Sequence, residues 1–203
     1  MAKARVRQGC SSRVVVAGWR GLSIYGMGSG NFGWGAGRPS KSGKKGRFLE
    51  QTIAIACDHA GLDLKRCLAD HLAGLGFQVL DLGTDGPGKV DYPDYAHALA
   101  EAIASGRTER GVLICGSGIG ISMAANRHSG IRAALVHEVE SARLARRHND
   151  ANVIAFGARF IEPETARTCL EAFLETEFEG GRHARRVAKL SPPVATRSSR
   201  KIA

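Results

Sequence analysis

The sequence lacks the features of a disulfide-stabilised, zinc-binding or membrane-spanning protein. Its five cysteines are odd in number and scattered, with no C-x-x-C pair, which favours reduced thiols in the cytoplasm over a disulfide framework or a zinc site. The seven histidines show no H-E-x-x-H or comparable ligand spacing. No apolar stretch reaches the roughly 20 residues that a membrane-spanning helix needs. We therefore expect a cytoplasmic protein without a bound metal and without a membrane segment.

Acidic residues are almost absent from the first 50 residues, which hold ten Lys and Arg against one acid, Glu50. This segment carries +9 of the net charge of +10, so the rest of the chain is nearly neutral. Eleven glycines and the absence of any periodicity predict a disordered basic extension over residues 1–50. It is open whether the extension is a mis-assigned start, a transit peptide or a nucleic-acid tail. Without interleaved aromatic residues the last is the least favoured, and nucleic acid is an unlikely partner.

Between the two ends, residues 51–190 alternate short apolar runs with amphipathic stretches, and we expect one domain there and a disordered basic tail over 191–203. The predicted strands cover 53–56, 77–80, 112–115, 131–136 and 153–156, each followed by a helix. Five such units predict an α/β, Rossmann-like three-layer sandwich, because parallel strands need crossover helices on the faces of the sheet. We expect the strand order 2-1-3-4-5, with a switch point between strands one and three.

The stretch 111–126 leads from the third strand through a glycine turn into a helix, and we place the chemistry there. Gly116, Gly118 and Gly120 let several backbone N–H groups point at one anion. Cys115 ends the strand, at the edge where ligands bind in open α/β sheets. The turn lacks the Lys-Ser/Thr of a P-loop and has the spacing G-x-G-x-G, which weakens a nucleotide-binding interpretation. Taken alone, it is also compatible with a purely structural turn and a packed core thiol.

Two further polar segments lie where they could join this turn. Cys57-Asp58-His59 follows the first strand, so it should face the glycine turn across the switch point, with Cys57 as a packing residue. After the fifth helix, Arg182 and Arg186 belong to a cation cluster that is either a solvated tail or a phosphate-binding site.

Seven segments of the sequence occur together in a known family, the B-type ribose-5-phosphate isomerases, which also contains the galactose-6-phosphate isomerase subunits. Residues 52–190 resemble this family, and the first fifty residues do not. The segments are CDHAG at 57–61, DYP at 91–93, ICGSGIGIS at 114–122, GIRA at 130–133, HND at 148–150, AFGAR at 155–159 and GGRH at 180–183.

The resemblance implies interconversion of an aldose and a ketose phosphate through a cis-enediolate, without a cofactor. It assigns Cys115 as the base that moves the proton, His148 as the residue that helps open the furanose ring, and Ser117 as a hydroxyl that assists transfer between the two oxygens. The resemblance places further positions around the substrate hydroxyls, the enediolate oxygen and the phosphate. These are Asp58, His59, Gly116, Gly118, Gly120, Asn149, Arg159, Arg182 and Arg186. Tyr92 is a weaker candidate for closing over the sugar.

Family members are dimers or tetramers with sites shared between subunits, so the resemblance also implies a homo-oligomer. Ribose 5-phosphate is the expected substrate, in the non-oxidative pentose phosphate pathway, with allose 6-phosphate or galactose 6-phosphate as alternatives. A different class also stays open: a nucleotide-binding regulatory module whose basic tail binds nucleic acid. The thiol at the glycine turn and the downstream His148 favour the enzyme.

Overall fold

The computed structural model describes residues 51–190, and every structural statement below refers to that part of the chain. The predictions of disorder for residues 1–50 and 191–203 lie outside the described residues. Within the described range, none of the helices combines the length and the apolar character that crossing a membrane requires.

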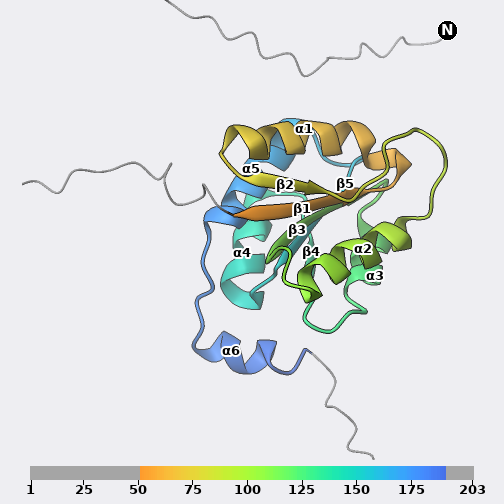
Figure 1. The fold of residues 1–203 in the computed structure, drawn as a ribbon. Helices are drawn as coiled ribbons and strands as arrows, with labels where there is room; N and C mark the ends of the chain where they lie inside the picture. Colours follow the sequence, from red (N-terminus) through yellow and green to blue (C-terminus); the bar gives the residue numbers. More distant parts are fainter. Residues whose placement is uncertain (1–50, 191–203) are drawn as a thin grey trace, which may run out of the picture. The chain divides into compact units, whose positions relative to one another are not determined.

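Strands and helices alternate as predicted (Figure 1). The strands are β1 (Thr52–Cys57), β2 (Gln78–Asp81), β3 (Arg110–Cys115), β4 (Ala133–Leu135) and β5 (Val153–Gly157). The α-helices are α1 (Leu62–Gly74), α2 (Tyr92–Ala104), α3 (Ile119–Ala125), α4 (Val139–Asn149), α5 (Pro163–Glu175) and α6 (Arg182–Val187), with a short 3-10 helix, η2 (His59–Gly61), before α1. Pro93 and Pro163 lie in the first turns of α2 and α5, where a missing N–H costs nothing.

The five strands form one parallel sheet in the order β2-β1-β3-β5-β4. The α/β Rossmann-like class and the switch point between β1 and β3 are confirmed, but the predicted order was wrong for the last two strands. All five residues of β5 are buried, as expected for a strand with neighbours on both sides, whereas the three residues of β4 are only half-buried. The short β4 therefore forms the edge, and β5 pairs with β3.

Alternate residues of the central strands enter two separate cores, one on each face of the sheet. Ile53, Ile55 and Cys57 pack with α1, α4 and α5. On the opposite face, the intervening strand residues pack with α2 and α3, and Cys115 belongs to this second core. The two thiols at the ends of β1 and β3 thus lie on opposite faces of the sheet, and only Cys115 adjoins the glycine turn.

Candidate active site

The two polar turns after β1 and β3 lie side by side, as the predicted switch point required. Cys57 pairs with Ile114 in the parallel register, and the N–H of Asp58 donates to the carbonyl oxygen of Ile114 at 3.1 Å. The carboxyl ends of the two central strands are thereby held together by the ladder itself. The structure therefore places Asp58 and His59 with Cys115 at the carboxyl ends of the strands.

The first turn fixes the side chains of Asp58 and His59. Oδ1 of Asp58 accepts from the N–H groups of Ala60 at 2.9 Å and Gly61 at 3.2 Å, which caps η2. Nδ1 of His59 accepts from the N–H of Val90 at 3.3 Å. A neutral imidazole whose Nδ1 accepts must carry its proton on Nε2, so this contact presents His59 as a donor to a ligand.

The second turn wraps around the sulfur of Cys115, whose side chain is buried. Sγ accepts from the N–H of Gly118 at 3.1 Å. Gly118 has a left-handed φ of +77°, and an added Cβ would lie 2.9 Å from the amide nitrogen of Gly157. Oγ of Ser117 accepts from the N–H of Ile119 at 3.3 Å. The turn is therefore packed closely against the end of β5, with an amide hydrogen directed at the thiol.

Two side chains cover the glycines of this turn. A methyl group on Gly116 would lie 3.1 Å from Cζ of Arg159, so the guanidinium rests directly on the Gly116 backbone. The N–H of Arg159 donates to the carbonyl oxygen of Gly116 at 3.1 Å, which holds the two segments together. A methyl group on Gly120 would lie 2.6 Å from Cζ of Tyr92. A cation and an aromatic ring thus flank the backbone amides beside Cys115.

The other predicted site residues lie at the opposite end of the sheet from Cys115, where the strands begin. Helix α4 starts beyond the carboxyl end of β4 and runs back, so His148 and Asn149 lie just before the amino end of β5. There the N–H of Gly111 donates to the carbonyl oxygen of Asn152 at 3.0 Å. Gly111 is the second residue of β3, and Cys115 ends that strand about 13 Å further on at the ~3.3 Å rise of each strand residue. The single chain does not bring His148 to Cys115.

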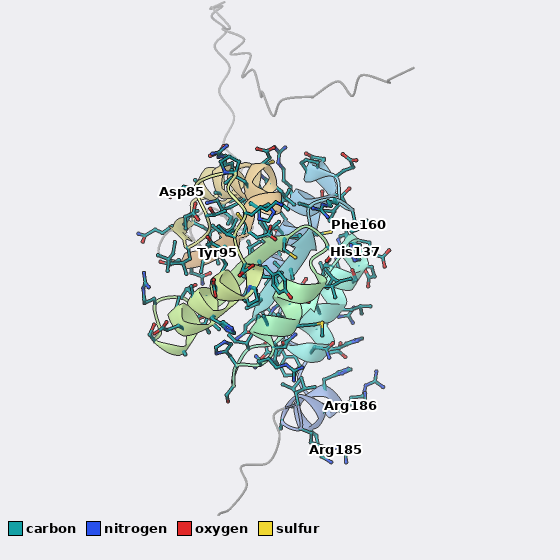
Figure 2. All side chains as sticks on the ribbon, turned by 90° about the vertical axis from the view of Figure 1, so that its right-hand side faces the viewer. Asp85, Tyr95, His137, Phe160, Arg185 and Arg186 are labelled. Carbon is teal, nitrogen blue, oxygen red and sulfur yellow. The ribbon has the colours of Figure 1, made fainter. Side chains whose placement is uncertain are left out.

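Arg182 and Arg186 lie on α6, which packs against α4. Figure 2 shows Arg185 and Arg186 away from His137 and Phe160, which follow the carboxyl ends of β4 and β5. The predicted site residues therefore form two groups. The first group lies with Cys115 at the carboxyl ends of the strands and contains Asp58, His59, Ser117 and Arg159. The second group lies toward the amino ends and contains His148, Asn149, Arg182 and Arg186.

The second group contains a pair of stacked histidines that we did not foresee. The rings of His148 and His183 lie 4.3 Å apart and within 4° of parallel. Nε2 of His148 is 3.8 Å from a carboxylate oxygen of Glu179, and Nε of Arg182 donates to Nε2 of His183 at 3.3 Å. Burial, then the charges of His148 and Arg182, lower the pKa of His183. His183 was visible in the GGRH segment, but no pattern in the sequence links it to His148.

A metal is conceivable only at this second group within the described residues, since donor atoms of His148, Glu179 and His183 lie within 4.8 Å of one another. The parallel rings, however, direct their in-plane lone pairs side by side instead of toward one point. Glu179 is also held by Arg147 at 3.2 Å. We assign no metal to this cluster.

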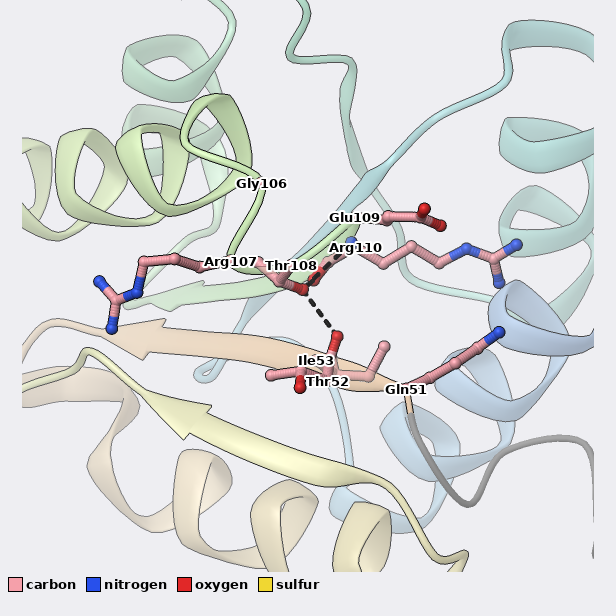
Figure 3. Close-up of a pocket in the computed structure, with 8 residues that line it drawn as sticks. All are labelled: Gln51, Thr52, Ile53, Gly106, Arg107, Thr108, Glu109 and Arg110. Atoms are coloured by element: carbon pink, nitrogen blue, oxygen red, sulfur yellow. Dashed lines mark hydrogen bonds between the residues drawn. The ribbon is translucent and has the colours of Figure 1, made fainter.

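Two hollows lie away from Cys115. A cleft of about 280 Å³ is lined by residues 51–53 and 106–110 at the amino ends of β1 and β3, where the hydroxyl of Thr108 donates to the carbonyl oxygen of Thr52 at 2.7 Å (Figure 3). None of the predicted site residues lines it. A groove of about 570 Å³ runs beside β4 and α4 and includes Asn149.

Comparison with known proteins gives a consistent picture. A family model described as Ribose/Galactose Isomerase matches residues 53–190. The chain is similar to ribose-5-phosphate isomerase B of Escherichia coli, with 47% identity over 68% of this chain and 93% of the relative. It is also 47% identical to D-erythrulose-4-phosphate isomerase of Pectobacterium atrosepticum, over 68% of this chain and 92% of the relative.

A solved structure of ribose-5-phosphate isomerase B from Clostridium thermocellum has the same fold, with a TM-score of 0.68 and 48% identity. The match covers 69% of this chain and 95% of that one. The similarity therefore spans nearly the whole of the relatives but only the described domain of this chain.

Proposed function

Since this chain belongs to the Ribose/Galactose Isomerase family, we propose that it is a cytoplasmic aldose-ketose isomerase that interconverts ribose 5-phosphate and ribulose 5-phosphate. The observation that carries the proposal is the turn around Cys115. A buried thiol that accepts an amide hydrogen bond lies beside the backbone amides of the glycine turn and the guanidinium of Arg159, the kinds of groups that a charged intermediate would require.

The proposed chemistry moves one proton between neighbouring carbons. The Cys115 thiolate takes the proton from C2 of the open aldose, and the electron pair of that bond forms the C1–C2 double bond as O1 gains negative charge. Amides of the Gly116 to Gly120 turn stabilise the enediolate, and each such donor is typically worth about 10²–10³ in rate. Ser117 passes a proton between the two oxygens, and Cys115 returns its proton to C1.

We propose that a second copy of the chain completes the site. His148, which would open the furanose ring, and Arg182 and Arg186, which would bind the phosphate, lie at the opposite edge from Cys115 and cannot reach it within one chain. Apolar side chains beside the Cys115 turn support a subunit contact there, since Ile119, Met123 and Phe160 are 54%, 57% and 70% exposed. A homodimer or homotetramer with shared sites satisfies both observations.

The direct test is an isomerase assay on the full chain with ribose 5-phosphate as substrate. We expect conversion to ribulose 5-phosphate, loss of most turnover in Cys115→Ala, and near-native turnover in Cys57→Ala. Cys57 is the matched control because it ends the neighbouring strand on the opposite face of the sheet. Near-native kcat in Cys115→Ala would refute the assignment of the base.

A four-carbon substrate is a specific second candidate, because the Pectobacterium atrosepticum relative is named D-erythrulose-4-phosphate isomerase. Erythrulose 4-phosphate, allose 6-phosphate and galactose 6-phosphate are therefore assayed in parallel. The highest kcat/KM for ribose 5-phosphate supports the proposed substrate, and a higher value for another sugar replaces it. Saturable nucleotide binding without any turnover would favour a nucleotide-binding module instead.

A further inference from the structure

We propose that His183 is a positioning residue for His148: its flat ring and the carboxylate of Glu179 hold the His148 imidazole in the orientation needed to open the sugar ring. This inference rests on the proposed function, because it takes ring opening as the role of His148. It adds a residue and an interaction that the proposed function does not need.

The contact between the two rings is well defined on both sides. The rings are parallel within 4° at 4.3 Å, and His183 is only 5% exposed, so its ring is fixed by its surroundings. His148 lies in the last turn of α4, where the side chain would otherwise have several rotamers. Stacking on a buried plane removes that freedom before a substrate arrives, and such preorganisation lowers the barrier of the catalysed step.

The segment before α6 ties the pair to the end of α4. The N–H of Glu179 donates to the carbonyl oxygen of Arg147 at 3.0 Å, and the Glu179 carboxylate lies 3.2 Å from the Arg147 guanidinium. The same carboxylate is 3.8 Å from Nε2 of His148. Glu179 thus restrains the His148 ring at its edge while His183 restrains its face.

The charges around the pair give the two rings different tasks. Arg182 and Arg186 on α6 and His148 on α4 all disfavour a proton on His183, while Glu179 is the acid that favours one. Nε of Arg182 donates to Nε2 of His183, which requires a lone pair on that nitrogen. His183 therefore serves as a neutral stacking surface. His148 is the ring that lies beside the carboxylate of Glu179, with its Nε2 at 3.8 Å.

Ring opening needs a proton that is delivered to the ring oxygen from a fixed position. Protonated His148 gives it to the ring oxygen O4, the C1–O4 bond breaks with its electron pair going to O4, and the C1 carbonyl forms as the O1 proton leaves to water. Water then reprotonates His148. A misdirected imidazole slows this step but does not affect proton transfer at C1 and C2, which requires Cys115.

The experiment separates the two steps by measuring hydrogen exchange of ribulose 5-phosphate in D₂O and, separately, conversion of ribose 5-phosphate. This ketose cannot close a five-membered ring, since its terminal oxygen carries the phosphate. Deuterium incorporation at C1 of the recovered ketose reports proton transfer alone, while conversion of ribose 5-phosphate, measured in a separate assay, requires ring opening as well. The variants of the full chain are His183→Ala, His183→Phe and Glu179→Gln. His71→Ala is the matched control, because that imidazole also contacts a carboxylate, Glu171 at 2.8 Å, between α1 and α5.

We expect His183→Ala to lower net conversion about tenfold or more, less than the ~10²–10⁴ of losing a general acid altogether, with C1 exchange within about threefold of native. Phe keeps a flat ring for stacking, so His183→Phe should recover most of the net conversion. Glu179→Gln should lower conversion selectively, even if His183→Ala fails to fold, and His71→Ala should change neither rate.

Equal loss of exchange and conversion in both His183→Ala and Glu179→Gln would show a merely structural role and overturn the inference. Unchanged rates in both variants would overturn it as well. Failure of the native chain to exchange the ketose or to convert the aldose would instead refute the proposed function, so the two failures are distinguishable.

Discussion

Replacing Gly118 by alanine should destabilise the protein and disable the Cys115 turn together. Gly118 has a left-handed φ of +77°, and its N–H donates to Sγ of Cys115 at 3.1 Å. An added methyl group would lie 2.9 Å from backbone atoms of Phe156 and Gly157 and would also contact Leu135. Backbone atoms of a central strand cannot move aside as a flexible side chain can, so the turn itself must shift.

Two terms set the magnitude of the change. The left-handed conformation costs an L-residue about 1–2 kcal/mol. Overpacking against β5 adds about 1–3 kcal/mol. Together they lower the free energy of unfolding by about 2–5 kcal/mol, a large part of the 5–15 kcal/mol that is typical of a domain.

Two other glycines separate these terms in a urea-unfolding series. Gly130→Ala meets the conformational cost alone, since its φ is +84° and no atom lies within 4 Å of the added Cβ. Gly86→Ala meets neither cost and should stay within about 0.5 kcal/mol of native. We expect the destabilisation to rise from Gly86 to Gly130 to Gly118, with lost turnover only in Gly118→Ala. Equal stability of the Gly118→Ala and Gly130→Ala variants would refute the reasoning from the close approach to β5.

Three further predictions concern single side chains. Lys65→Met should lower the free energy of unfolding by about 1–3 kcal/mol in urea titrations, because the 2% exposed Lys65 holds the Asp81 carboxylate at 2.8 Å; an unchanged unfolding midpoint would contradict this. Burial raises the pKa of Cys57 from 9.0 to about 11, so the unfolded state loses this proton first and stability falls as the pH rises from 9 to 11. Between pH 9 and 11, the free energy of unfolding of Cys57→Ala should therefore fall by about 2–3 kcal/mol less than that of the native protein. Parallel curves of unfolding free energy against pH would refute the raised pKa of Cys57. Arg182→Ala should raise KM for the sugar phosphate with a smaller effect on kcat, which steady-state kinetics check, and an unchanged KM would exclude a phosphate-binding role.

Local patterns predicted the fold class and one half of the candidate site. Apolar runs and glycine turns located all five strands, and the switch point placed Asp58 beside the Cys115 turn. The order of β4 and β5 depends on which strand is covered on both sides, and both runs are apolar in the sequence. Arg132 offered a hint, since a charged residue immediately before β4 suits an edge strand, and there it pairs with Asp150 at 2.7 Å.

Interactions between distant segments account for what the sequence did not predict. Lys65 reads as a surface residue beside the apolar stripe of α1, yet it is buried because Asp81 and the carbonyl oxygen of Thr84 receive its ammonium. The stacking of His148 on His183 joins α4 to α6 across thirty-five residues. The separation of His148 from Cys115 follows from the return direction of α4, which the element order implies but the motifs alone do not show.

The central claim is a site built from Cys115 of one subunit and His148 of another, and complementation between two inactive variants tests it most directly. Cys115→Ala and His148→Ala are produced together in one cell, purified as full chains and assayed for conversion of ribose 5-phosphate. In a shared-site dimer, half of the randomly paired molecules carry one intact site, so the mixture should recover about a quarter of native turnover. Activity no higher than that of the separate variants, in a mixture shown to contain the mixed dimer, would contradict the shared site.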